Sequence, residues 1–194
     1  MDDLLRQAVA RGLLRDLDYH FARRMAARLT EPSPAFLLAA ALTSQRVGEG
    51  DVCLDLTACG DLPLFQPEGL GRDLSPPALG PWMDSLRESG LVSGPDDPGP
   101  LVLDPAGRLY LGRYWHFEQV LLQALTARAG AWSPDVDRPL LRAGLERLFG
   151  PAEGLDWQRI AAAMAVLRPF CVISGGPGTG KTRTVTSILA LLIE

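Results

Sequence analysis

Apolar residues recur at helical spacing through the first part of the chain, and Pro and Gly separate the segments that carry them. Residues 17–29, LDYHFARRMAARL, have an apolar residue at every fourth position, which predicts a helix with one apolar face. The residues of this face are Leu17, Phe21, Met25 and Leu29. Ser33 and Pro34 are typical of a helix N-cap and first turn, and Gly48 is suited to end the helix that follows. Because residues 35–47 are apolar nearly all round, we expect this helix at the centre of a small bundle.

Turn signals divide the next part of the chain into a helix, a hairpin and further helices. Ser75 and two prolines precede a predicted helix that Gly90 ends. Residues 101–112, LVLDPAGRLYLG, follow a cluster of Gly, Pro and Asp and predict two short strands joined by a turn that contains Gly107. More helices are predicted at 114–128, at 138–150 after a Ser133–Pro134 turn, and at 156–167 before Pro169.

The pattern changes at Phe170. Residues 170–174, FCVIS, form a continuous apolar run that predicts a strand buried on both faces. A glycine-rich loop follows, and residues 181–194 then predict a helix with one apolar side. The residues of this side are Val185, Ile188, Leu189 and Leu192. A strand, a glycine loop and a helix in this order are the start of a parallel α/β domain.

Composition and charge narrow the class of protein. Hydrophobic residues make up 47% of the chain and charged residues 22%, which is ordinary for a soluble globular protein. The acidic N-terminus lacks a long apolar core, and no apolar run is long enough to span a membrane, so we expect a cytoplasmic protein without a membrane partner. A net charge of −4 argues against this chain wrapping duplex DNA unaided.

Residues 175–182 match the phosphate-binding pattern G-x-x-x-x-G-K-[ST] at every fixed position. The residues of this motif are Gly175, Gly176, Pro177, Gly178, Thr179, Gly180, Lys181 and Thr182. Glycines let successive main-chain N–H groups turn toward phosphate oxygens, and the following helix adds its own free N–H groups. The Lys181 ammonium suits the β- and γ-phosphates of ATP, and the Thr182 hydroxyl suits the Mg²⁺ that bridges them.

The motif is incomplete as a catalytic site. Hydrolysis also needs an acid for the metal, a residue that positions water and an arginine, and these come from later strands. A lone strand at 170–174 leaves its backbone groups unpaired. We therefore expect a mainly α N-terminal domain with a small β-hairpin, residues 1–112, followed in residues 113–194 by the truncated start of an α/β P-loop domain. This piece is not expected to turn over ATP by itself.

Three stretches together with the loop resemble the RecD family of helicases, the alpha subunit of exodeoxyribonuclease V in the RecBCD complex. They are LAAALTSQRVGEGDVCLDL at 38–56, RLYLGRYW at 108–115 and DWQRIAAAMAV at 156–166, which precede VISGGPGTGKT. The resemblance implies an ATP-driven 5′→3′ DNA helicase of superfamily 1 that works in double-strand-break repair by recombination. It also implies that residues 113–194 are the truncated beginning of the first RecA-like motor domain, and that single-stranded DNA binds to motor domains missing from this chain. Gln158 matches the glutamine that reads the adenine edge in related helicases.

The resemblance further implies RecB-like and RecC-like partner subunits, with the N-terminal domain docked on the RecC-like subunit. Candidate docking residues are Trp82, Leu86, Leu109 and Tyr110, although core packing explains each of them equally well.

Three alternatives stay open: another P-loop NTPase or kinase, a pure protein-interaction module, and a winged-helix DNA reader within residues 78–112. The kinase interpretation does not explain Gln158 or the long, mainly helical segment before the loop. The lack of a basic cluster around Arg87, Arg108 and Arg113 counts against DNA reading.

Overall fold

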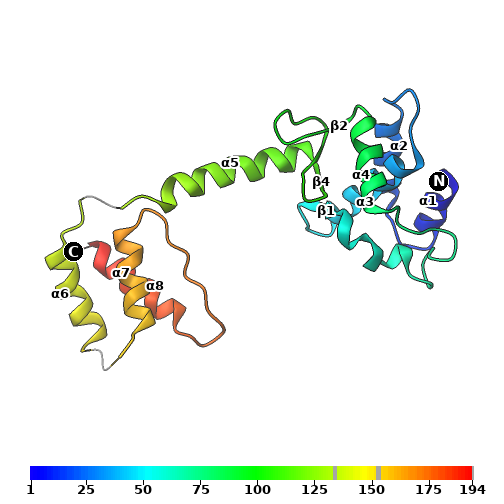
Figure 1. Cartoon of the computed structure of the whole chain (residues 1–194). Coiled ribbons are helices and arrows are strands. Elements are labelled where there is room, and N and C mark those ends of the chain that lie inside the picture. Colours follow the sequence, from blue (N-terminus) through cyan, green and yellow to red (C-terminus); the bar gives the residue numbers. More distant parts are fainter. Residues whose placement is uncertain (133–134, 152–153, 194) are drawn as a thin grey trace. The chain divides into compact units, whose positions relative to one another are not determined.

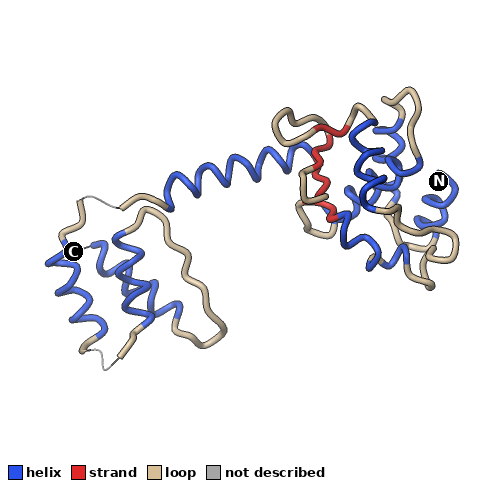
Figure 2. Tube along the Cα trace, viewed as in Figure 1, coloured by secondary structure: helices blue, strands red, loops and turns tan. Residues whose placement is uncertain are grey.

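The structure, a computed structural model, describes residues 1–132, 135–151 and 154–193 (Figure 1). The chain divides into two compact units, residues 1–119 and 120–194. Helices dominate both units, and the strands lie in the first (Figure 2). This confirms the expected fold class of a mainly helical N-terminal part with a small sheet. The predicted Ser133–Pro134 turn lies outside the described residues.

Helix α3 (Pro34–Gly48) is the central element of the first unit and packs against α2 (Asp16–Ala26), with α1 (Asp2–Ala10) beside them (Figure 1). The Ser33 hydroxyl caps α3 by accepting a hydrogen bond from the Phe36 N–H at 3.1 Å. All side chains from Leu38 to Ser44 are buried. The prediction of a central helix, capped at Ser33 and apolar on most sides, is confirmed.

The buried face of α2 differs from the predicted one. Leu17 is 64% exposed, whereas the inward side chains are those of Asp18, Tyr19, Ala22, Met25 and Ala26. The prediction from apolar spacing is therefore wrong for Leu17 and confirmed for Met25, and Phe21 and Leu29 are half-buried against the same core. The physical reason is the Asp18 carboxylate, whose partners on α3 and at the start of α2 turn its side of the helix inward.

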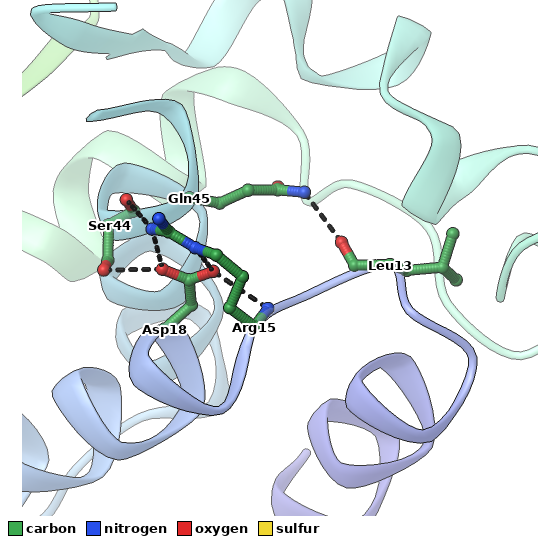
Figure 3. Close-up of polar contacts among 5 residues, drawn as sticks. All are labelled: Leu13, Arg15, Asp18, Ser44 and Gln45. Atoms are coloured by element: carbon green, nitrogen blue, oxygen red, sulfur yellow. Dashed lines mark hydrogen bonds and ion pairs between the residues drawn. The ribbon is translucent and has the colours of Figure 1, made fainter. Parts of the chain in front are cut away.

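A cluster of hydrogen bonds around Asp18 joins α2 to α3 (Figure 3). One carboxylate oxygen of Asp18 accepts from the main-chain N–H and the Nε of Arg15, both at 3.0 Å. The other accepts from the Arg15 Nη2 at 2.6 Å and from the Ser44 hydroxyl at 2.7 Å. Nearby, the Gln45 amide donates to the Leu13 carbonyl at 2.7 Å. A buried carboxylate thus has charged and neutral donors on both of its oxygens, which is what burial of a charge requires.

Burial of Asp18 favours the neutral acid and by itself raises its pKa. Hydrogen bonds from the Arg15 guanidinium, the Ser44 hydroxyl and the Arg15 main-chain N–H favour the carboxylate and outweigh burial, so the pKa of Asp18 is lowered. The ionised carboxylate of Asp18 therefore contributes to the stability of the folded state.

The sheet of the first unit has the order β1-β4-β3-β2. Its strands are β1 (Cys53–Asp55), β2 (Val92–Ser93), β3 (Leu101–Leu103) and β4 (Arg108–Leu111). The predicted hairpin is β3 and β4, which pair antiparallel, and β1 and β2 extend it on both sides. The hairpin turn places Gly107 at φ +84°, and the Asp104 carboxylate accepts from the Arg108 N–H at 2.9 Å and Nε at 2.7 Å. The hairpin prediction, including its glycine, is confirmed.

The four candidate docking residues lie in the core of the first unit. Trp82 and Leu86 are on α4 (Leu79–Glu88), and both are almost fully buried, as are Leu109 and Tyr110 on β4. The Trp82 indole donates to the Ala35 carbonyl at 3.0 Å. Short 3₁₀ turns at Leu56–Asp61 and Pro63–Phe65 complete this core. A docking role for these residues was wrong, because a buried side chain offers a partner no surface.

In its described residues, the second unit contains three helices besides the end of α5 (Gly112–Ala129), within which the division between units falls. These helices are α6 (Arg138–Phe149), α7 (Trp157–Leu167) and α8 (Lys181–Ile193). Their small core contains Leu141, Leu145, Ala162 and Leu191. The predicted apolar side of α8 is mostly exposed, at 48% for Val185 and 56% for Leu189. Of the predicted side, Ile188 packs against this core, and the buried residues of α8 are Thr184, Ser187 and Leu191.

The predicted strand at 170–174 is not formed. Residues 170–176 have no regular secondary structure, Cys171 is exposed and Val172 is 74% exposed. A strand exists only through hydrogen bonds to a neighbour, and within the described part of the second unit no strand lies beside this segment. The apolar run therefore lies extended and unpaired before the loop.

We predict that replacing Asp18 by Asn lowers the free energy of unfolding by about 2–4 kcal/mol at pH 7, because a neutral amide cannot accept from all of these donors. Chemical denaturation measures the change. Asp16→Asn, which removes an exposed acid in the same helical turn, is the matched control and should cost less than about 1 kcal/mol.

The same comparison has a predicted dependence on pH. The pKa of Asp18 in the folded protein lies below its value of about 4 in the unfolded chain. The carboxylate therefore stabilises the fold above about pH 4, and this stabilisation is lost as the pH falls through the pKa of the folded state. The difference between wild type and Asp18→Asn should thus be constant near neutrality and narrow below about pH 4. A difference that stayed constant down to pH 2 would contradict the role assigned to the carboxylate.

Candidate functional site

Two helices of the second unit flank the glycine loop. The Asp156 side chain caps α7, because its Oδ1 accepts from the Gln158 N–H at 2.9 Å and from the Arg159 N–H at 3.1 Å. This cap fixes Trp157 and Gln158 in the first turn of α7. Helix α8 begins at Lys181, directly behind the loop, so its first free N–H groups adjoin the glycines.

The loop has a closed conformation that its glycines allow. Gly178 and Gly180 have φ of +77° and +78°, a region that other residues rarely adopt. The Thr179 hydroxyl donates to the Gly176 carbonyl at 2.9 Å. The Lys181 ammonium donates to the carbonyl oxygens of Gly175 at 2.5 Å and Gly176 at 2.6 Å. The lysine therefore links both ends of the loop.

Gln158 lies against the loop from α7. Its Nε2 donates to the Thr179 carbonyl at 3.1 Å, although the two residues are 21 positions apart in the chain. A Cβ at Gly180 would collide with the same amide nitrogen. Gln158 thus connects α7 to the loop, a contact that the sequence did not predict.

The structure brings the predicted site residues together in one loop and the helix turn beside it. These residues are Gln158, Gly175, Gly176, Pro177, Gly178, Thr179, Gly180, Lys181 and Thr182. A cavity of about 750 Å³ lies here, lined by the start of α7 and by Ser174, Gly175, Thr179 and Lys181. This volume is in the range of small-ligand sites. Sequence reasoning missed Leu155 and Trp157, which also line the cavity. The sequence signal that could have identified Trp157 is an indole next to Gln158 in the first turn of a predicted helix.

The loop fits a phosphate group. Among the described residues, none accepts a hydrogen bond from the main-chain N–H groups between Gly175 and Gly180. These donors and the first N–H groups of α8 therefore have no acceptor within the described residues, and those that follow Pro177 can bind an anion beside a cationic lysine.

The fit to Mg²⁺ depends on the nucleotide. The Thr182 hydroxyl makes no hydrogen bond to a described residue and can act as a ligand. Within the described ranges, no group of three or more His, Cys, Asp or Glu side chains could hold a metal ion. A magnesium ion here would take its other ligands from phosphate oxygens and water, as Mg²⁺ commonly does.

Comparison with known proteins identifies the class and then the family. Residues 158–194, with the loop and α8, match the family model of the AAA domain. The chain belongs to the RecD family, because residues 10–110 match the model described as RecBCD enzyme subunit RecD, N-terminal domain. In the described residues, no helix is both long and apolar enough to cross a membrane.

Several relatives are named RecBCD enzyme subunit RecD. The relative from Mycolicibacterium smegmatis is 36% identical over 94% of this chain and 30% of its own length. One from Mycobacterium tuberculosis is 37% identical over 94% of this chain and 29% of its own length. One from Haemophilus influenzae is 32% identical over 91% of this chain and 31% of its own length. The chain thus spans about 30% of the length of these relatives.

We predict different costs for alanine at two glycines that have almost the same φ. Gly178→Ala introduces only backbone strain, about 1–2 kcal/mol, because nothing lies within 4 Å of the new Cβ. Gly180→Ala should cost about 1 kcal/mol more, because it also displaces the Gln158 amide from Thr179. Denaturant titration of both variants measures the difference.

The Gln158→Ala background provides the control for this pair. In that background the two glycine variants should be equally destabilised, because the amide is absent. Equal costs in the wild-type background would show that the contact between Gln158 and the loop contributes nothing.

Proposed function

We propose that this chain is the nucleotide-binding part of a RecD-type DNA helicase subunit. The observation that carries the proposal is the closed loop at 175–182, with unpaired main-chain N–H groups and the Lys181 ammonium in one cavity. In this proposal the loop binds the phosphates of ATP and Lys181 contacts the β- and γ-phosphates. Thr182 is a ligand of Mg²⁺, and Gln158 contacts the edge of the adenine.

The proposed partners follow from the relatives, which are named as subunits of the RecBCD enzyme. We propose a complex with RecB-like and RecC-like subunits, in which residues 1–112 dock on the RecC-like subunit. In the complete protein, motor domains beyond residue 194 bind single-stranded DNA and move 5′→3′ during double-strand-break repair in the cytoplasm. The proposed boundary at 112 and 113 lies at the start of α5.

This part of the protein is proposed to bind ATP without hydrolysing it. Among the described residues that line the cavity, the carboxylate is that of Asp156, which caps α7. A water-positioning group and an arginine for the developing charge must also be supplied. The loop therefore orients the phosphates and balances their charge, and the hydrolytic groups come from other parts of the full-length protein.

The alternatives are less well supported. For a winged-helix DNA reader, Arg87 and Arg108 would have to face phosphates, but they pair with Asp84 and Asp104 at 3.2 and 2.7 Å. A P-loop kinase does not account for the match of residues 10–110 to the RecD N-terminal model. An interaction module without nucleotide binding does not account for the loop.

We predict that Lys181→Ala in the full-length protein, assembled with its partner subunits, lowers DNA-stimulated ATP hydrolysis at least about 100-fold, because a preorganised charge at the phosphates is lost. A phosphate-release assay measures the rate. Arg142→Ala is the matched control, since it removes an exposed cation of the same unit outside the cavity. If Lys181→Ala hydrolysed ATP as fast as Arg142→Ala, the proposed function would be wrong.

A further inference from the structure

Trp157 is an exposed aromatic side chain with no evident structural role. Its exposed fraction is 72%, against 1% for Trp82 in the core and 50% for Trp132. Trp132 has the Arg168 guanidinium 3.6 Å from its ring centre, and Trp115 packs edge-on against Tyr110 at 5.0 Å. Trp157 has no ring or cation partner among the described residues. An indole loses much favourable free energy when it stays in water, so its exposure needs a cause.

The position of Trp157 supplies that cause. It lines the same cavity as Lys181 and Thr179, and Leu155, itself 67% exposed, lines the cavity beside it. The Asp156 cap holds Trp157 and Gln158 together in the first turn of α7. The cavity therefore combines a polar wall, rich in N–H donors, with an apolar wall made by Leu155 and Trp157. A ligand that suits both walls has an anionic part and a flat apolar part.

We propose that Trp157 and Leu155 form a nucleobase subsite, in which the base of the bound nucleotide stacks on the indole of Trp157. The inference rests on the proposed function, since the phosphates must occupy the loop. Stacking of a base on an aromatic side chain contributes to affinity for any base, because every base has a π face. Trp157 thus supplies affinity and leaves the choice among bases to Gln158.

The contacts of Gln158 define that choice. Its Nε2 is engaged with the Thr179 carbonyl, and its Oε1 accepts no hydrogen bond from a described residue. A free amide oxygen accepts from an exocyclic amino group, such as the N6 of adenine, and has nothing to receive from the O6 of guanine. The subsite therefore accepts bases that carry an amino group at that edge.

Calorimetric titration of the full-length protein with ATP and with inorganic tripolyphosphate tests the subsite. Because tripolyphosphate has no base, only ATP binding should depend on Trp157. Trp157→Ala should weaken ATP binding roughly 5- to 150-fold and change the affinity for tripolyphosphate less than about 2-fold. Trp132→Ala, which removes a half-exposed indole of the same unit outside the cavity, should change neither affinity.

Trp157→Phe provides a second, conservative variant with its own readout. Phenylalanine also stacks on a base, so ATP affinity should stay within about 5-fold of wild type. The wild-type tryptophan fluorescence should be quenched by ATP and not by tripolyphosphate, and this quenching should be lost in Trp157→Phe.

The possible outcomes separate the two claims. If wild type binds neither ligand, the proposed function fails, and the subsite fails with it. If wild type binds both ligands and Trp157→Ala leaves ATP affinity unchanged, or weakens both ligands equally, the subsite is overturned while phosphate binding stands. In that case the exposure of Trp157 would instead belong to a contact with another part of the full-length protein.

Discussion

The hydrogen bonds from the Lys181 ammonium to the carbonyl oxygens of Gly175 and Gly176 are the interaction on which the site depends. In a trans peptide the C=O and N–H groups point in opposite directions, so carbonyls that face the lysine turn the adjoining N–H groups away from it. Pro177 has no N–H at the next position. The donors left for an anion are therefore those after Pro177 and in the first turn of α8. The lysine thus fixes the loop and also supplies its charge.

The two units are stabilised in different ways. The first has an extensive apolar core, and the buried Asp18 carboxylate joins two of its helices through donors on both. The second has a small core, and α8 leaves Val185, Leu189 and Leu192 exposed on one face. An apolar helix face of this kind is what the sheet of an α/β domain covers. The unpaired apolar segment before the loop has the residue types of a strand in such a sheet.

Local signals in the sequence were sufficient for some elements and not for others. The central helix, the hairpin with Gly107 and the glycine loop each depend on residues close together in the chain, and each was predicted correctly. The inward face of α2 depends on the contact of Asp18 with Ser44, 26 positions away, and apolar spacing cannot show it. Strands β1 and β2 have three and two residues, too few for an alternating pattern to appear. The strand at 170–174 needs a neighbour that the described residues do not supply.

Hydrogen–deuterium exchange of the full-length protein, with and without ATP and Mg²⁺, measures whether the main-chain amides of the loop bind the phosphates. ATP should slow exchange of the main-chain amides between Gly178 and Thr182, because those N–H groups donate to phosphate oxygens in the bound state. Unchanged exchange of these amides at an ATP concentration that saturates hydrolysis would contradict phosphate binding by the loop. The nucleotide would then bind elsewhere.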